Sequence, residues 1–223
     1  MGNDAAKDQA DGCNGFNSFI NKTMSEIQFM EKPEWVSWEE VCECIRKANV
    51  VNDKQGFHML FSDVTPEVLE RKLEDGHCFV ALHNNKVVGT ASYVISKVRS
   101  WCLNGSVICF CYDGILPDYR GTDVYLGLRK IKWDEANKTG IKKKFFTTAE
   151  DNKTVIKINL KFGFKLVQFQ PTGKGADYYS VTMVKWEDGC PFPDWFLKFM
   201  FKLSKFVSKT FLKPDYKFKY WFH

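Results

Sequence analysis

The pattern of apolar residues changes near the middle of the chain, and this change restricts the possible folds more than any other feature. Between residues 78 and 116, short alternating segments follow one another, as in β-hairpins. After these residues, segments with apolar residues at helical spacing alternate with short apolar strands. We therefore predict an α/β (α+β) fold with a mixed, mostly antiparallel twisted sheet of about seven strands and helices on both faces. The strands are expected at residues 27–29, 78–82, 87–95, 107–116, 144–149, 164–169 and 178–186.

Capping signals indicate where the helices begin. Ser37 and Glu40 form a capping box, in which each side chain can bond the backbone N–H of the other residue. Thr65 can cap a second helix, because a proline follows it at the first helical position. Two further helices are expected over 122–138 and 152–162, and a glycine follows each of them.

A length of 223 residues leaves room for one domain with an elaborated end. We expect a loose N-terminal extension over 1–25, rich in Asn, Asp, Gly and Ala, then a domain over 26–186 and a C-terminal extension over 187–223. No apolar run approaches the roughly 18 to 20 residues that a membrane-spanning helix needs. The N-terminus also lacks the basic and then apolar segments of a signal peptide, so we expect a cytoplasmic protein.

The net charge of +5 is concentrated at one end of the chain. Residues 191–223 hold seven Lys against Asp194 and Asp215, so this segment carries the whole excess of positive charge. The charges of the preceding residues sum to zero. A neutral body argues against nucleic acid as a partner, because phosphate binding needs Lys and Arg gathered on one face.

The cysteines indicate thiols rather than a metal site. None of the eight belongs to a C-x-x-C pair or has a histidine at zinc-finger spacing, so we expect free thiols and no metal. Cys109 and Cys111 would share one face of a strand, where a metal or redox pair and plain apolar packing are alternatives. We favour packing, because free cysteine is usually a small buried hydrophobe.

The segment I-L-P-D-Y-R-G-T, from Ile115 to Thr122, places a strand end, a proline turn and a helix start next to one another. Free backbone N–H groups and the positive end of the helix dipole then meet in one place, which favours an anion such as pyrophosphate. The same residues would also serve as an ordinary strand-turn-helix connection.

A second informative segment begins about thirty residues further on, at Asn152, and has the pattern N-x-x-x-I-x-I-x-L-x-F-G-F-K-L-V. Together with I-x-P-D-Y-R-G from Ile115, it resembles the GNAT superfamily of acyl-CoA N-acyltransferases. The expected order of strands and helices, from about Glu26 to Trp186, is similar to that family as well.

The resemblance implies that acetyl-CoA, or another acyl-CoA, lies between the strand that ends at Leu116 and the strand over 144–149. In the family, the first of these strands carries a bulge, and backbone amides near Ile115 would bind the pantetheine arm and the thioester carbonyl. Asn152 would face the pantetheine arm. The residues that correspond to the family's pyrophosphate-binding positions R-x-x-G-x-G/A are Arg120, Gly121, Thr122, Asp123, Val124 and Tyr125.

Three residues depart from the family's pattern. Asp123 and Tyr125 stand where the family has glycine or another small residue, which lets the backbone approach phosphate closely. Asp123 would either place a carboxylate in the anion site or cap the helix. Asn159 stands where many members carry the tyrosine that protonates the leaving thiolate, and asparagine cannot serve as that acid.

An active enzyme would therefore take its acid and base from other residues. Tyr112, Tyr178 and Tyr179 are the candidate acids, unless the thiolate leaves unaided. Asp113 is the candidate base, because it lies just before the strand end, where an aspartate bonded to a loop is the alternative.

The basic tail has the pattern of an amphipathic helix over 194–213. Its lysines fall at spacings of 4, 3 and 4, which predicts one basic face opposite Phe199, Leu203 and Phe206. Such a helix is typical of peripheral contact with a membrane, here its inner face. The alternative is that the helix packs on the domain or on the second subunit of a homodimer.

Two classes of function follow. The leading prediction is an enzyme that transfers an acetyl or similar group from acyl-CoA to a primary amine of a small molecule, or of a sugar or lipid intermediate, in a ternary complex. The alternative is a catalytically silent domain of the same fold that serves as a binding or scaffold module, which Asp123 and Asn159 favour.

Overall fold

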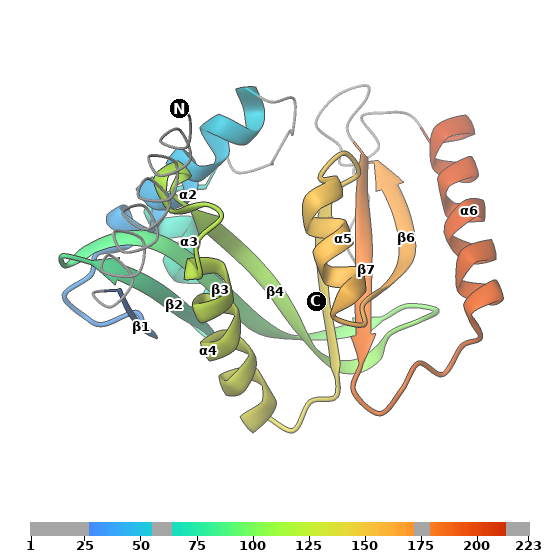
Figure 1. Cartoon of the computed structure of the whole chain (residues 1–223). Coiled ribbons are helices and arrows are strands. Elements are labelled where there is room, and N and C mark those ends of the chain that lie inside the picture. The colour runs from blue at the N-terminus through green and yellow to red at the C-terminus, as the bar shows by residue number, and fades with distance from the viewer. Residues whose placement is uncertain (1–26, 55–63, 172–178, 213–223) are drawn as a thin grey trace, which may run out of the picture.

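The computed structural model describes residues 27–54, 64–171 and 179–212. The described strands form one seven-stranded sheet in the order β1-β2-β3-β4-β5-β7-β6 (Figure 1). All neighbouring strands are antiparallel except β4 and β5, which are parallel. The mixed, mostly antiparallel sheet is therefore confirmed. The strands are β1 (Gln28–Glu31), β2 (Gly76–His83), β3 (Lys86–Arg99), β4 (Asn104–Ile115), β5 (Lys143–Ala149), β6 (Lys165–Pro171) and β7 (Tyr179–Trp186).

Helices cover both faces of this sheet. The described helices are α2 (Trp38–Lys54), α3 (Pro66–Lys72), α4 (Val124–Lys138), α5 (Lys153–Lys161) and α6 (Asp194–Thr210), with a short 3-10 turn η1 (Pro117–Tyr119). Among the described residues, no helix is both long and apolar enough to cross a membrane. The N-terminal extension over 1–25, Tyr178 and the tail from 213 onward lie outside the described residues.

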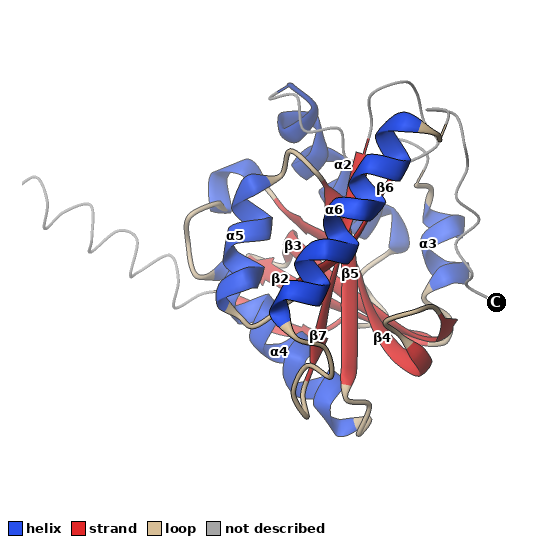
Figure 2. Cartoon of the chain, turned by 90° about the vertical axis from the view of Figure 1, so that its right-hand side faces the viewer, coloured by secondary structure: helices blue, strands red, loops and turns tan. Residues whose placement is uncertain are grey.

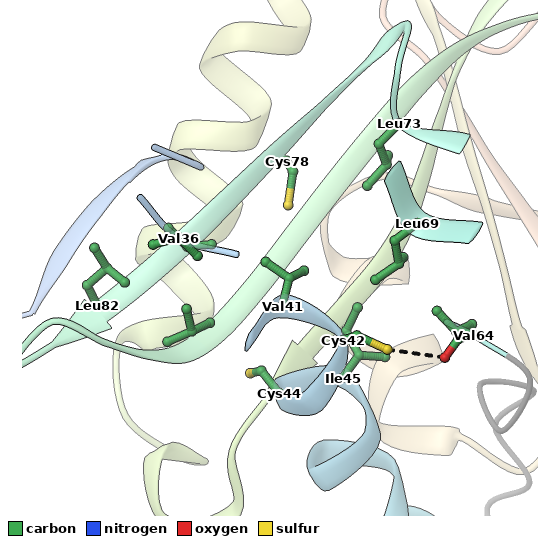
Figure 3. Close-up of a cluster of buried hydrophobic side chains, with 12 residues drawn as sticks. Val36, Val41, Cys42, Cys44, Ile45, Val64, Leu69, Leu73, Cys78 and Leu82 are labelled. Atoms are coloured by element: carbon green, nitrogen blue, oxygen red, sulfur yellow. Dashed lines mark hydrogen bonds between the residues drawn. The ribbon is translucent and has the colours of Figure 1, made fainter. Parts of the chain in front are cut away.

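The alternation of side chains along β2 shows which helices cover each face of the sheet. Cys78, Val80 and Leu82 belong to the buried cluster under α2 and α3, which Figure 3 shows. In the same cluster, the Cys42 thiol donates a hydrogen bond of 3.1 Å to the Val64 carbonyl. Phe79 lies on the opposite face of the sheet, in the cluster under α4.

The local signals in the sequence are confirmed. The Ser37 N–H donates to Glu40 Oε2 at 2.9 Å and the Glu40 N–H donates to Ser37 Oγ at 3.2 Å, which closes the capping box. The Val68 N–H donates to the Thr65 hydroxyl at 3.3 Å. Asn84 and Asn85 turn the β2–β3 hairpin with φ of 50° and 58°.

The β3–β4 hairpin is longer than predicted at both strands. β3 continues to Arg99 instead of ending at residue 95, and β4 begins at Asn104 instead of residue 107. The extension stays ordered because Val98 and Leu103 are buried in a cluster with Leu197 of α6. A helix far along the sequence therefore lengthens the hairpin.

The C-terminal helix α6 packs against the edge strand β6 (Figure 2). The Phe169 N–H donates to Ser204 Oγ, and the Ser208 hydroxyl donates to the Phe169 carbonyl, both at 3.0 Å. Two serines of the helix thus bond backbone groups of a strand that has no further strand beside it. The part of the tail that the structure describes packs on the domain.

The prediction that the lysines of this helix lie opposite its aromatic residues is wrong. Phe199, Leu203 and Phe206 are exposed, and Lys198 and Lys202 are exposed as well. At 100° per residue, the lysine row lies beside the aromatic row rather than across from it. A third face, which includes Leu197, Ser204 and Ser208, is the one turned toward the sheet.

Candidate active site

The two parallel strands in the centre of the sheet separate and leave a cavity. β4 and β5 pair at Ile108–Lys144 and Cys109–Phe145, and beyond this point they diverge toward their C-terminal ends (Figure 1). A cavity of about 440 Å³ lies there, lined by both strands and by side chains of α4 and α5. It occupies the place in which the resemblance put acyl-CoA.

A bulge in β4 lies beside this cavity. Ser92 of β3 is opposite Cys111 and Thr90 is opposite Gly114, so β4 holds one extra residue in this interval. Tyr112 takes φ of 53° there, a conformation that a bulky side chain adopts rarely and at a cost of about 1–3 kcal/mol. The Thr90 hydroxyl bonds the Tyr112 carbonyl at 3.1 Å. The resemblance implied a bulge in this strand.

The bulge changes which face of the sheet each residue meets. Tyr112 lines the cavity, and its side chain also packs against the cluster under α2 and α3. Burial raises the pKa of the Tyr112 phenol above its ordinary value of 10.0, so this group keeps its proton at neutral pH. Asp113 and Ile115 line the cavity as well.

Asp113 is held by a buried lysine. The Lys132 ammonium, on α4, lies 2.6 Å from Asp113 Oδ1 and 2.5 Å from Oδ2, and the Ser92 N–H donates to Oδ1 at 3.3 Å. The ammonium also lies 4.7 Å from the ring centre of Phe110. The Asp113 carboxylate is therefore part of an ion pair with a helix rather than a free base, and its partners lie on β3 and α4 rather than in a loop.

A second polar group on the cavity wall joins α4 to α5. The Arg129 Nη1 donates to the Tyr125 hydroxyl and to Asn159 Oδ1, each at 2.9 Å. Asn159 Nδ2 donates to the Val155 carbonyl at 2.9 Å, and the guanidinium lies 3.7 Å from the ring centre of Phe162. Arg129 thus holds a phenol from α4 next to the asparagine that replaces the family's tyrosine.

The environment of Tyr125 keeps its hydroxyl protonated. Burial raises the pKa of Tyr125 above its ordinary value of 10.0, and the nearby Arg129 offsets part of this increase. The hydroxyl oxygen accepts from Arg129, and a side-chain hydrogen bond with Asn159 also lowers the pKa of Tyr125.

Sequence reasoning missed Arg129 and Lys132. Both line the cavity together with Tyr125. The three residues are spaced by four and three on one predicted helix, which puts them on the same face. The spacing of these residues from Tyr125 would have identified them in the sequence.

Of the predicted phosphate loop, Tyr125 lines the cavity and residues 120–124 do not. The Arg120 side chain turns toward α2, where its Nη2 donates to the Ala48 carbonyl at 2.6 Å. Gly121 takes φ of 76°, and a Cβ there would meet no atom within 4 Å. Asp123 stands at the N-cap of α4, but its side chain makes no hydrogen bond to the helix. The alternative that the Asp123 carboxylate caps the helix by a hydrogen bond is therefore not met. The Thr122 hydroxyl donates to the Tyr119 carbonyl at 2.6 Å.

The remaining predicted residues divide between the cavity and the core. Asn152 lines the cavity and caps α5, since its Oδ1 accepts from the Val155 N–H at 3.3 Å. Val124, the first residue of α4, is fully buried, and the Leu116 N–H donates to the Val88 carbonyl at 3.0 Å. The structure therefore brings together five predicted site residues. They are Tyr112, Asp113, Ile115, Tyr125 and Asn152.

The thiols and acidic groups form no metal site within the described chain. Across residues 27–54, 64–171 and 179–212, no three His, Cys, Asp or Glu side chains lie together as metal ligands. The seven described cysteines are free thiols. Cys109 and Cys111 each pack against a buried apolar cluster, as the packing alternative requires.

Compared by sequence, the chain matches no protein-family model and no curated protein. Compared by structure, it matches many acetyltransferases. An acetyltransferase of the GNAT family from Streptococcus pneumoniae has a TM-score of 0.54 and 18% identity, covering 72% of this chain and 99% of that one. A ribosomal-protein-alanine N-acetyltransferase from Brucella melitensis has a TM-score of 0.54 and 15% identity, covering 71% and 99%.

A third match is to a structure with a ligand. A GNAT family acetyltransferase from Elizabethkingia anophelis, with acetyl-CoA bound, has a TM-score of 0.50 and 12% identity, covering 72% of this chain and 98% of that one. At these identities the likeness concerns the fold. The bulge in β4 and the divergence of β4 from β5 are features that the resemblance implied, and this chain has the GNAT fold.

Proposed function

We propose that this protein is an acyltransferase that moves an acyl group, in the simplest case acetyl, from acyl-CoA to a primary amine in a ternary complex. The observation that carries the proposal is the cavity of about 440 Å³ between the diverging strands β4 and β5 in a chain of this fold. The bound acetyl-CoA of the Elizabethkingia structure and the N-acetyltransferase title of the Brucella structure support it. We place the reaction in the cytoplasm and expect a small-molecule amine, or a sugar or lipid intermediate, as acceptor.

The residues on the cavity wall suit the arm and the phosphates of an acyl-CoA. Much of the wall is apolar, and Asn152 offers a polar group to the amides of a pantetheine arm. At the start of α4, the backbone N–H groups and the helix dipole favour pyrophosphate. Because the Arg120 guanidinium bonds Ala48, we assign phosphate binding to the backbone of the loop rather than to this side chain. The acyl-CoA supplies an activated thioester.

Tyr125 is the residue that we assign as general acid. It lines the cavity, it keeps its proton, and Arg129 orients it next to Asn159. When the acceptor amine attacks and the C–S bond breaks, Tyr125 would donate its proton to the leaving sulfur. The proton that the new amide nitrogen releases restores the phenol. A positioned acid of this kind contributes about 10²-fold to 10⁴-fold in rate.

The test compares two tyrosine variants. Binding of acetyl-CoA is measured by calorimetry, and CoA release with a panel of primary amines is followed by chromatography, because the eight cysteines would react with a thiol dye. Tyr125→Phe should lower kcat at least about 10²-fold and leave the Kd of acetyl-CoA nearly unchanged. Tyr119→Phe is the control, since this phenol bonds His83 outside the cavity.

The results separate the proposed enzyme from a binding module. Absence of acetyl-CoA binding would sink the whole proposal. Binding of acetyl-CoA without transfer to any amine would favour the silent module. The arrangement of Asn159 supports that alternative. Its amide is buried and bonds Arg129 and Val155 rather than projecting an acid into the cavity. Equal kcat in Tyr125→Phe and wild type would remove Tyr125 from the mechanism and leave the transfer itself intact.

A further inference from the structure

The outward face of α6 carries a stripe of exposed apolar side chains. Six of the thirteen large hydrophobic side chains that are exposed among the described residues lie on this helix or at its end, where they are 36% to 70% exposed. Soluble proteins rarely expose such a contiguous apolar surface without a binding role. The members of the stripe are Trp195, Phe199, Leu203, Phe206, Val207 and Phe211.

This stripe is separate from the contacts that hold the helix on the domain. Leu197 and Ser208 are buried on the inner side, and Lys205 bonds Glu150 of the β5–α5 connection at 2.5 Å. Figure 2 shows α6 lying across the sheet with its outer side turned to the viewer. The exposed aromatic residues are therefore not needed for docking α6 on its own domain.

The charge around the stripe is positive. Lys198 and Lys202 are exposed beside the aromatic row, one helical turn apart. The sequence that follows α6, residues 213–223, adds three more Lys and five aromatic residues against a single Asp. Exposed aromatic rings flanked by lysines match the chemistry of an anionic bilayer surface, where the rings enter the headgroup region and the ammonium groups meet lipid phosphates.

We propose that the outer face of α6 docks this protein on an anionic membrane surface, with the helix lying in the plane of the interface. A second copy of the chain suits this face less well. In a two-fold symmetric contact the exposed lysines beside each stripe would add charge of a single sign at the rim, with no acidic partner on the stripe of the other copy. The inference concerns a surface away from the cavity and does not depend on the proposed transfer reaction.

The experiment measures co-sedimentation of the full chain with vesicles of neutral lipid alone and with roughly 30 mol% anionic lipid. We expect binding to the anionic vesicles that weakens as salt is added, because exposed charges are screened over about 8–10 Å. Phe199→Ser/Phe206→Ser should abolish binding. Lys198→Gln/Lys202→Gln should weaken it by about five-fold for each lysine removed.

A charge-matched control removes two exposed lysines from another helix. Lys157→Gln/Lys161→Gln on α5 should bind as wild type does. Because all four positions on α6 point outward, circular dichroism and Tm of the variants should remain those of wild type. Wild type that stays in the supernatant with anionic vesicles at low salt would overturn the proposal. So would undiminished binding of the Phe199→Ser/Phe206→Ser variant, or a dimer in light scattering that this variant dissociates.

Discussion

The ion pair between Asp113 and Lys132 should be required for stability. Asp113→Asn keeps the size of the side chain but leaves the Lys132 ammonium, whose side chain is 4% exposed, without an anionic partner. Removing one partner of a buried pair costs about 3–5 kcal/mol. The Asp113 side chain is 48% exposed and the Phe110 ring remains near the ammonium, so water and the ring replace part of the lost interaction. We therefore expect a loss of about 2–3 kcal/mol in the free energy of unfolding.

Urea denaturation followed by tryptophan fluorescence measures this change. The double variant Asp113→Asn/Lys132→Met removes the buried charge as well and should recover most of the loss. Asp134→Asn is the control on the same helix. Its carboxylate pairs with an exposed lysine, Lys130, at 2.8 Å, and should be worth less than about 1 kcal/mol. If Asp113→Asn changed stability no more than Asp134→Asn, the carboxylate would not be compensating a buried charge, and its assignment as a free base would return.

Three further predictions concern the start of α4 and the tail. Asp123→Gly should tighten acetyl-CoA binding at least several-fold in calorimetry, since a carboxylate about 6 Å from pyrophosphate repels it by about 3 kcal/mol at the effective dielectric constant near a protein surface; weaker binding would mean that the carboxylate supports the loop. Gly127→Ala should lower Tm, because a Cβ would lie 2.4 Å from the Phe29 ring and overpacking costs about 1–3 kcal/mol; a higher Tm would show that the ring moves aside and helix propensity prevails. Truncation after Trp186 should lower Tm by about 10 °C, because it removes the burial of Leu197 and both hydrogen bonds to Phe169. An unchanged Tm would contradict the packing of α6 on β6.

Much of the fold could be predicted because its signals are local. A cap such as Ser37–Glu40, or the Asn84–Asn85 turn, satisfies backbone groups within a few residues, so the residue types alone indicate it. The alternation along β2 sorts its side chains between two faces, whatever covers them. The change from hairpins to alternating helices and strands was sufficient for the mixed sheet.

The chemistry of the site depended on contacts between distant segments. Residue spacing indicated that Asp113 ends a strand near the cavity, but only packing against α4 showed that Lys132 binds it. Arg120 looked like a phosphate ligand in sequence, yet α2 offers it a carbonyl 72 residues away. The placement of Tyr125 next to Asn159 likewise required two helices to meet across the cavity.

The C-terminal helix α6 shows most clearly which properties follow from the sequence and which follow from the tertiary structure. Its sequence by itself determined an amphipathic basic helix, because periodicity and charge are properties of one segment. Which side of that helix turns inward was decided only by the tertiary structure. Edge strand β6 presents backbone groups that Ser204 and Ser208 can bond, so the serine face packs inward and the aromatic and lysine rows remain exposed. A hydrophobic residue is buried only where the fold provides a surface to cover it, and periodicity does not specify that surface.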